Sequence, residues 1–300
     1  MMGIGSTIEV SALAIGAALF WGFEPAFSKR GLDGAGTWMQ NTLVVLGTRT
    51  ALYWVLLVVT GGAAALTGIT AETVVLFALS GVVASGLGRL LFYVAVDEIG
   101  SAITNAFTNT RPLFAVGLAV VLLGEDVTVL MAIGTLVIVA GLVVMTLSEG
   151  GDIEGWDRRY LALPLLTATF FALGNIIRRF GFTTATIEPL QAIAIANLAA
   201  FIFVSGTAVV SDNHDLHGSR ESYAYFTVSG LFAGMGLLLV FQALSLDGGH
   251  VAIVDPLTAT APLFTTVFAA AFLRDVERVT LGTVVGVLVA IAGVVLVTAG

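Results

Sequence analysis

Residues 101–125 read SAITNAFTNTRPLFAVGLAVVLLGE, and residues 251–277 read VAIVDPLTATAPLFTTVFAAAFLRDVE. The second stretch repeats the first after 150 residues, half the length of the 300-residue chain. The residues that the two stretches share are Ala102 and Ala252, Ile103 and Ile253, Thr108 and Thr258, Thr110 and Thr260, and Pro112–Phe114 and Pro262–Phe264. A repeat of this period indicates two copies of one large unit rather than the short units of a solenoid.

The repeat continues, after a slip of two residues, as far as Ser148 in the first copy. Here the shared residues are Glu125 and Glu277, Val127 and Val279, Thr128 and Thr280, Gly134 and Gly286, and Ala140–Gly141 and Ala292–Gly293. Each copy predicts an apolar helix with a proline near its middle, a short acidic turn, and a second apolar helix rich in Gly and Ala. Many membrane transporters are built from two such units.

The composition predicts an all-α integral membrane protein. Hydrophobic residues make up 58% of the chain and charged residues 11%, against about 45–50% and 25% in soluble domains. The mean hydropathy of +1.02 excludes a water-soluble fold. The chain has no cysteine, which excludes disulfides and thiolate chemistry and leaves the redox compartment open.

The charge pattern argues against a nucleic-acid partner, because the net charge is −8. Acids dominate the loops, and Lys29 is the only lysine. This balance is typical of halophilic proteins, whose acidic surfaces stay solvated at high ionic strength. A merely acidic set of loops is the other interpretation.

About 20 apolar residues are needed to cross a hydrocarbon core of about 30 Å. On this measure we predict ten transmembrane helices, at about 9–28, 39–60, 72–96, 101–123, 128–148, 160–180, 189–210, 223–246, 250–273 and 280–299. Residues 1–9 carry no Lys or Arg and do not resemble a cleaved signal peptide. We therefore expect the first span to be a retained helix.

The spans divide the chain into two units joined by a linker. We place the first unit at residues 1–148, an acidic linker at 149–159, and the second unit at 160–300. Each unit has five spans, an odd number, so the second must enter the membrane from the opposite side and the repeats are inverted. A second polar loop carries His214 and His217, which we interpret as solvated residues rather than metal ligands.

Several of these features resemble the EamA-type transporters of the drug/metabolite transporter (DMT) superfamily. They are Trp21-Gly22 in the first span, Arg49 in the second, and the repeated proline helix followed by Glu125 or Glu277. The resemblance covers almost the whole chain. It implies a multi-pass protein of the plasma membrane that exports or exchanges amino acids, other metabolites or drugs, as a monomer or homodimer.

The resemblance and the loop charges disagree on orientation. Ten-span members of the superfamily are usually drawn with both termini in the cytoplasm, and we follow that expectation. Lys29 and most loop arginines fall on one side, however, and only Arg178 and Arg179 border the loops of the other. The positive-inside rule would therefore place the termini outside. The two halves also differ, since Leu173-Gly174 and Asn197 stand where the first half has Trp21-Gly22 and Arg49.

A polar stripe runs along the fourth span. At about 100° per residue its members share one face of the helix, and these are Ser101, Asn105, Thr108, Asn109 and Pro112, repeated in the ninth span as Asp255, Thr258 and Pro262. A proline cannot donate to the carbonyl four residues earlier, which frees the carbonyls of Thr108 and Thr258. The stripe is either a contact for a polar solute or a kink that only shapes helix packing.

Five ionisable residues lie at membrane depth: Glu24, Arg49, Arg89, Arg111 and Asp255. Each costs about 2.5–3.5 kcal/mol on insertion and is therefore a functional candidate. Mutual ion pairs that hold helices together are the alternative interpretation. If all five are charged, one positive charge is left over, which favours an anionic or zwitterionic solute.

These observations give a candidate substrate site. Its residues are Trp21, Glu24, Arg89, Tyr93, Asn105, Thr108, Asn109, Arg111, Asn175, Gln242, Asp255 and Thr258. We expect Arg89 or Arg111 to hold a carboxylate, and Asp255 or Glu24 to carry a coupling proton. We also expect spans one, three, four, six, eight and nine to surround a central cavity, with spans five and ten at the periphery.

The chain lacks the motifs of intramembrane serine and aspartyl proteases, the metalloprotease motif HExxH, and the nucleotide-binding motifs Walker A and GxGxxG. We therefore predict no enzyme activity, cofactor or metal. The predicted function is secondary-active transport of small metabolites such as amino acids, outward, coupled to H⁺, Na⁺ or a counter-solute. Multidrug or cation efflux and a facilitative, channel-like permease remain the alternatives.

Overall fold

The computed structural model describes residues 4–34, 36–61, 67–149, 157–210, 218–272 and 280–300. This part of the chain is a helical bundle in which ten segments are long and apolar enough to cross a membrane. The predicted all-α fold with ten spans is confirmed. Most of the predicted acidic linker, the loop histidines His214 and His217, and Glu277 lie outside the described residues.

The first half begins at the N-terminus and the second with a short 3₁₀ helix. The elements of the first half are α1 (Ile4–Asp33), α2 (Trp38–Gly61), α3 (Ala71–Gly81), the π-helix η2 (Val82–Gly88), α4 (Arg89–Ile99), α5 (Ser101–Thr108), α6 (Arg111–Leu118), the π-helix η3 (Ala119–Leu123) and α7 (Val129–Glu149). Those of the second half are η4 (Arg158–Leu161), α8 (Ala162–Thr184), α9 (Pro189–Val210), α10 (Arg220–Ser245), α11 (Val251–Thr258), α12 (Ala261–Phe272) and α13 (Leu281–Ala299).

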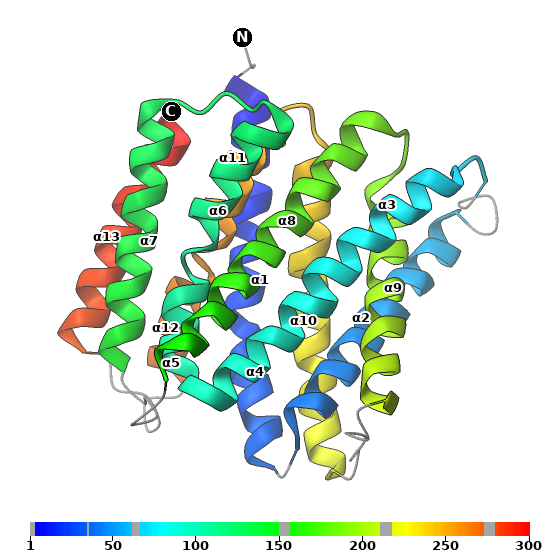
Figure 1. The fold of residues 1–300 in the computed structure, drawn as a ribbon, viewed down its shortest axis with the longest axis horizontal. Coiled ribbons are helices and arrows are strands. Elements are labelled where there is room, and N and C mark those ends of the chain that lie inside the picture. Colours follow the sequence, from blue (N-terminus) through cyan, green and yellow to red (C-terminus); the bar gives the residue numbers. More distant parts are fainter. Residues whose placement is uncertain (1–3, 35, 62–66, 150–156, 211–217, 273–279) are drawn as a thin grey trace.

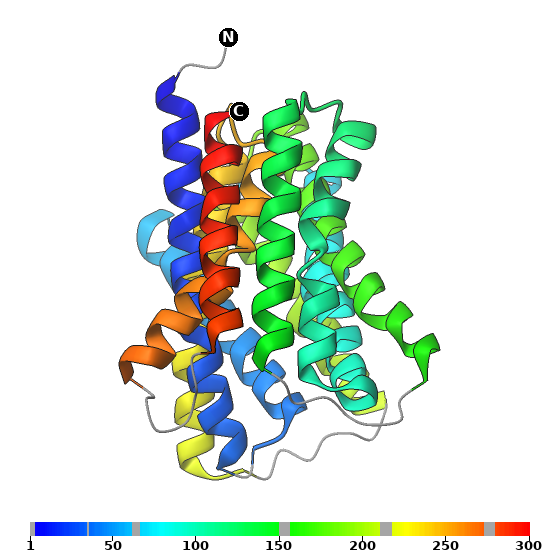
Figure 2. The same cartoon turned by 90° about the vertical axis from the view of Figure 1, so that its left-hand side faces the viewer.

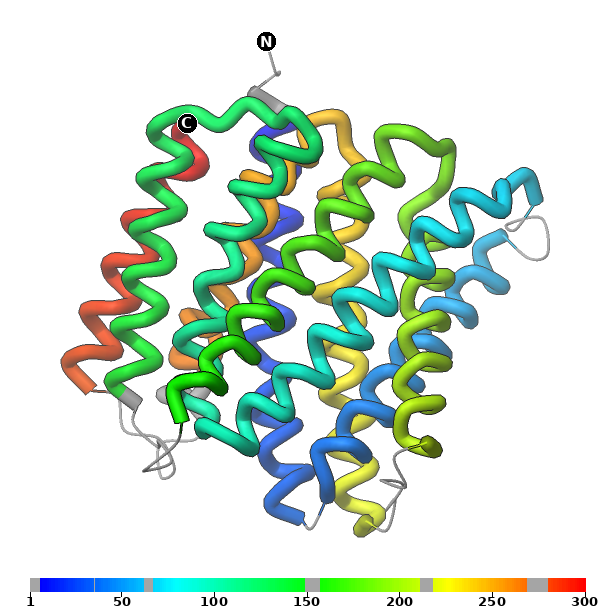
Figure 3. Tube along the Cα trace, in the orientation of Figure 1, coloured from blue at the N-terminus to red at the C-terminus, as the bar shows by residue number. Residues whose placement is uncertain are grey.

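The two halves run in opposite directions. In Figure 1, α1 descends from the end of the bundle where the N-terminus lies, whereas its counterpart α8 rises toward that end. Figure 2 shows both chain termini at the same end. The tube in Figure 3 shows α3, η2 and α4 as one inclined helix. The predicted pair of inverted five-helix repeats is therefore confirmed.

The proline helices are broken rather than kinked, which corrects the expectation of one continuous helix in each copy. In the first copy α5 ends at Thr108, and Thr110 N donates to Phe107 O at 3.1 Å in a tight turn. Pro112 then lies in the first turn of α6, where a missing N–H costs nothing. In the second copy Thr260 N donates to Leu257 O at 3.2 Å, between α11 and α12.

The helices α7 and α13, which come after the two proline-containing spans, begin in the same way in both halves. Thr128 Oγ1 accepts a hydrogen bond from Met131 N at 3.1 Å before α7, and Thr280 Oγ1 accepts one from Thr283 N at 3.1 Å before α13. A threonine at this position satisfies one of the free N–H groups of a helix start. The repeated threonines Thr128 and Thr280 are therefore helix caps.

The helices α7 and α13 pack against each other along their length at one edge of the bundle (Figures 1 and 2). A Cβ atom on Gly141 would lie 2.6 Å from Gly286 O, and one on Gly134 would lie 2.9 Å from Gly293 O. Each glycine of one copy thus faces the non-equivalent glycine of the other, as an antiparallel twofold crossing requires. Close approach of backbones is a common way for helices to associate in a membrane.

We predict that Gly141→Ala lowers the thermal unfolding midpoint in detergent, because the added methyl would lie 2.5 Å from Ala290 N. Overpacking of this kind costs about 1–3 kcal/mol. The control is Gly117→Ala in α6, where an added Cβ meets nothing within 4 Å. The control should be neutral or slightly stabilising, and an equal fall for both variants would contradict the packing argument.

Candidate functional site

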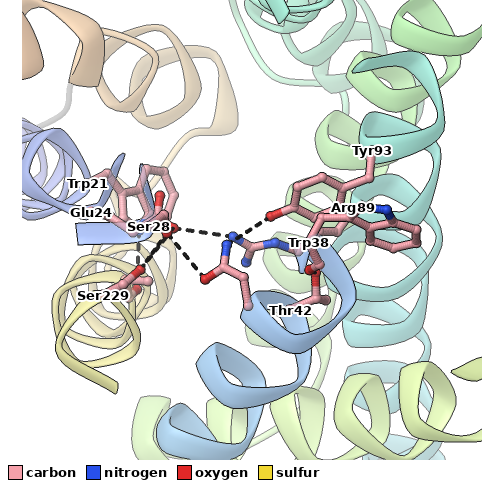
Figure 4. A network of polar contacts seen from close by, with 10 residues as sticks. Trp21, Glu24, Ser28, Trp38, Thr42, Arg89, Tyr93 and Ser229 are labelled. Carbon is pink, nitrogen blue, oxygen red and sulfur yellow. Dashed lines mark hydrogen bonds and ion pairs between the residues drawn. The ribbon is translucent and has the colours of Figure 1, made fainter. Parts of the chain in front are cut away.

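A carboxylate from α1 and a guanidinium from α4 meet inside the bundle. Glu24 Oε1 lies 3.5 Å from Arg89 Nη2, and both side chains are about one-fifth exposed. Two hydroxyl groups hold the same carboxylate oxygen: Ser28 Oγ at 3.0 Å and Ser229 Oγ, from α10, at 3.2 Å. Figure 4 shows Glu24 and Ser28 on one side of this contact and Arg89 on the other.

The network extends to α2 and to an aromatic pair. Ser28 Oγ lies 3.3 Å from Asn41 Oδ1, and Asn41 Nδ2 donates to Tyr93 Oη at 3.3 Å. The Tyr93 ring stacks on Trp38 with a centroid separation of 5.3 Å. We name Glu24, Ser28, Asn41, Arg89, Tyr93 and Ser229 the Glu24 cluster.

A second set of polar groups surrounds Asp255, whose side chain is fully buried. Arg111 Nε donates to Asp255 Oδ2 at 3.1 Å, and Asn175 Nδ2 donates to Asp255 Oδ1 at 2.6 Å. Arg178 Nη1 donates to Asn175 Oδ1 at 2.7 Å, and Arg111 Nη2 donates to Thr258 Oγ1 at 3.1 Å. We name Arg111, Asn175, Arg178, Asp255 and Thr258 the Asp255 cluster.

The helix breaks position this cluster. Arg111 is the first residue of α6, directly after the break in the fourth span, and Thr258 is the last residue of α11, directly before the break in the ninth. These two segments pack together, so the two breaks face each other across the boundary between the repeats. Broken helices at the interface of inverted repeats are where transporters commonly bind solutes and ions.

The remaining candidate residues do not join either cluster. Trp21 Nε1 donates to Ala233 O at 3.2 Å, which ties α1 to α10, and Asn109 Nδ2 donates to Thr146 Oγ1 on α7 at 3.1 Å. Thr108 Oγ1 is buried and has no partner among the described residues. The amides of Asn105 and Gln242 are half-buried and make no hydrogen bond with another described side chain. Of the predicted stripe of the fourth span, Asn109 thus bonds to α7, and a shared contact of the stripe with a solute stays a prediction.

Arg178 and Arg179 correct an expectation, since the sequence suggested that they border a loop. The helix α8 continues to Thr184, and both side chains are buried, with 4% and 8% exposed. Sequence reasoning also missed Ser28, Asn41 and Ser229. Asn175 and Arg178 are three residues apart and share a helix face, a signal that could have identified Arg178.

Polar contacts to helix ends join the two repeats or neighbouring helices at the end of the bundle where the termini lie. Glu125 accepts hydrogen bonds from Val251 N and Ala252 N, both at 2.9 Å, and so caps α11 of the other repeat. Arg179 donates to three carbonyls at the end of α10, those of Leu244, Leu246 and Asp247, at 2.9, 2.7 and 3.0 Å. We name Glu125 and Arg179 with these partners the Glu125 latch.

A cavity of about 300 Å³ adjoins the latch. Its lining residues include Gly124, Glu125, Arg179 and His250. Gly124 has φ = 65°, the left-handed conformation, which turns the chain after η3 so that Glu125 can reach α11.

Comparison with known proteins agrees with this architecture. The family model of the EamA-like transporter family matches residues 10–147 and again residues 158–299. An "Uncharacterized transporter" of Clostridium kluyveri is 27% identical over 146 residues, which cover 48% of this chain and 46% of that protein. A solved crystal structure superposes with a TM-score of 0.79 at 15% identity, over 96% of this chain and 98% of the other, and shows the fold alone.

The two family matches together cover nearly the whole chain, and each covers five of the ten spans. The chain therefore belongs to the EamA-like transporter family and is a multi-pass membrane protein built from two EamA repeats.

Proposed function

We propose that the chain is a secondary-active exporter of small zwitterionic or weakly acidic metabolites, such as amino acids, in the plasma membrane. The observation that carries this proposal is the contact of Arg111, from the first repeat, with Asp255 and Thr258 of the second. It lies at the facing helix breaks, inside the bundle. A charged contact shared by both repeats can be remade as they move against each other, as alternating access requires.

Two acids are available to couple transport to a proton. Asp255 is fully buried and bonded to groups from both repeats, whereas Glu24 is about one-fifth exposed. Intramembrane carboxylates of this kind commonly serve as proton relays in transporters. We keep both as coupling candidates, with Na⁺ or a counter-solute as the alternative driving force.

The pairing of both intramembrane acids with arginines favours metabolites over cationic drugs as the transported solutes. A cation-binding site needs a carboxylate that is free to pair with the solute, but Asp255 and Glu24 are each held by an arginine.

The function is tested by counterflow into proteoliposomes that contain the purified protein, with labelled amino acids, organic acids and cationic dyes as solutes. We expect uptake of amino acids or weak acids, dependent on an imposed pH gradient if Asp255 or Glu24 carries a proton. Liposomes without protein give the background. Transport of the dyes alone would replace the proposal with multidrug efflux. Uptake that does not depend on the pH gradient would exclude the proton as the coupling ion.

We predict that Asp255→Asn destabilises the protein by about 3–5 kcal/mol, because it leaves the Arg111 charge buried without its acid. The double variant Arg111→Gln/Asp255→Asn should recover most of the thermal stability in detergent but not the counterflow. If the double variant transports like the wild type, the pair is structural only.

A matched control for this prediction is the pair Arg159 and Asp157, which lie 3.3 Å apart with side chains 72% and 56% exposed. The double variant Arg159→Gln/Asp157→Asn should leave both the unfolding midpoint and the counterflow unchanged, because exposed ion pairs contribute little.

The Glu125 latch predicts which end of the transporter is closed in this conformation. Glu125→Ala removes two hydrogen bonds from the start of α11, and the loss of a helix cap costs about 0.5–2 kcal/mol. That energy changes a conformational equilibrium by roughly 2- to 30-fold. We therefore expect the variant to open this end more often.

The measurement uses Ile176→Cys, a buried position one turn before Arg179 on α8, in a chain without other cysteines. Its labelling by a membrane-impermeant maleimide should rise in the Glu125→Ala background. Glu188→Gln, at an exposed site just before α9, should not change the labelling. Equal labelling in the wild-type, Glu125→Ala and Glu188→Gln backgrounds would contradict the proposal that the Glu125 latch closes this end.

A further inference from the structure

Two arginines inside the bundle have donor groups that the protein leaves unused. Arg49, on α2, is 4% exposed, and its Nε and Nη2 have no hydrogen-bond partner among the residues that the structure describes. Arg178, on α8, is also 4% exposed, and its Nε has no partner in the same part of the chain. Leaving a buried charged donor unsatisfied is costly, so such groups call for explanation.

The two arginines belong to one region of the interior. Tyr53, one turn beyond Arg49 on α2, and Phe241, the ring beside Arg178, belong to one buried cluster, and like charges in one region repel each other. Tyr53 Oη donates to Gly234 O at 2.8 Å, which fixes the phenol against α10. Arg49 Cγ occupies the space beside Gly234, 3.2 Å from where a Cβ atom would stand.

Arg178 is held from the second repeat. Its guanidinium carbon lies 4.9 Å from the centroid of the Phe241 ring, and its Nη1 bonds to Asn175. A guanidinium that stacks on an aromatic ring keeps its in-plane donors available for an acceptor. The region is therefore walled by rings and presents N–H groups from both repeats.

The nearby acids are already engaged. Both oxygens of Asp255 accept hydrogen bonds, from Arg111 and Asn175, and Glu24 faces Arg89. The four arginines at positions 49, 89, 111 and 178 thus face two carboxylates, which leaves two positive charges in the interior of the described chain. From the sequence we counted only one excess positive charge, because Arg178 was placed at the border between a helix and a loop.

We propose that Arg49 and Arg178 form an anion seat that binds the carboxylate of the transported solute. This inference rests on the proposed function and narrows its substrate to carboxylate-bearing solutes. The planar donors of arginine match the two oxygens of a carboxylate in charge-assisted hydrogen bonds. The proposal assigns the carboxylate-binding role to Arg49 and Arg178 instead of Arg89 and Arg111, each of which is already paired with an acid of the protein.

The anion seat contains one arginine from each repeat, so binding of an anion there affects both repeats. Arg49 is in the middle of α2, in the first repeat, and Arg178 is in the last two turns of α8, in the second. An anion between them replaces repulsion across the boundary of the repeats with attraction.

The experiment measures thermal unfolding of the purified full-length chain in detergent against increasing ligand at constant ionic strength. The probes are sodium propionate and L-leucine, their carboxylate-free counterparts propionamide and L-leucinamide, and sodium chloride. We expect a saturable rise of the midpoint with at least one of the two carboxylates, because a ligand that binds the native state stabilises it. The amides and chloride should give no rise.

Arg49→Gln and Arg178→Gln should each weaken the apparent affinity for the carboxylate by roughly tenfold or more. Arg159→Gln, whose side chain is 72% exposed, should leave it unchanged. If one of the two variants does not fold, the other and the comparison of carboxylate with amide on the wild type still decide the result.

An equal rise with chloride and the carboxylates overturns the assignment to a solute, since the seat would then hold an inorganic anion. No rise with either carboxylate, or a rise that survives both substitutions, overturns the seat itself. Counterflow separates this failure from that of the proposed function. If leucine counterflow is unchanged in both variants, the anion seat is wrong and the proposed transport function stands. If the carboxylates bind but no counterflow is measured, the seat stands and the proposed function is wrong.

Discussion

A charged side chain inside a bilayer must find its partner within the protein, because lipid offers none. For its buried acids this bundle meets that constraint with contacts that cross helices and repeats. Asp255 is held by Arg111 of the other repeat, and Glu125 caps the start of α11 from the other repeat. Arg179 donates hydrogen bonds to three carbonyls at the end of α10. The polar interior therefore fixes how the two halves meet, while apolar surface faces outward.

The duplication gives a symmetric arrangement of helices around an interior whose polar residues are not symmetric. The symmetry of the helices is visible where Gly134 and Gly141 face Gly293 and Gly286 across the crossing of α7 and α13. The interior differs because the copies carry different polar residues. At the spacing of the repeat, Arg111 corresponds to Ala261 and Asp255 to Asn105. The charged bridge between the repeats is thus made once, and its symmetric counterpart carries no charge, so the two sides of the site offer a solute different chemistry.

The ten spans and the inverted repeat could be predicted because hydropathy and internal identity depend on sequence alone. The partners of each polar residue could not, because they depend on how each helix is rotated against its neighbours. Asn109 illustrates this: it shares a predicted face with Thr108 but bonds to α7. The helix breaks near Pro112 and Pro262 escaped prediction because a proline is compatible with either a kink or a restart. Arg178 was misplaced because α8 runs past the predicted end of its span, to Thr184.

In the proposed exporter, binding of the solute should favour the change of conformation, and the surplus of positive charge gives a physical basis for this coupling. A ligand shifts a conformational equilibrium only through its different affinity for the two states. In the proposed seat, the like charges of Arg49 and Arg178 repel each other across the boundary of the repeats when no anion is bound. Any state that brings α2 and α8 closer is therefore disfavoured when the seat is empty. A bound carboxylate reverses the sign of the interaction, so the same two charges that oppose closure of the empty protein favour closure of the loaded one.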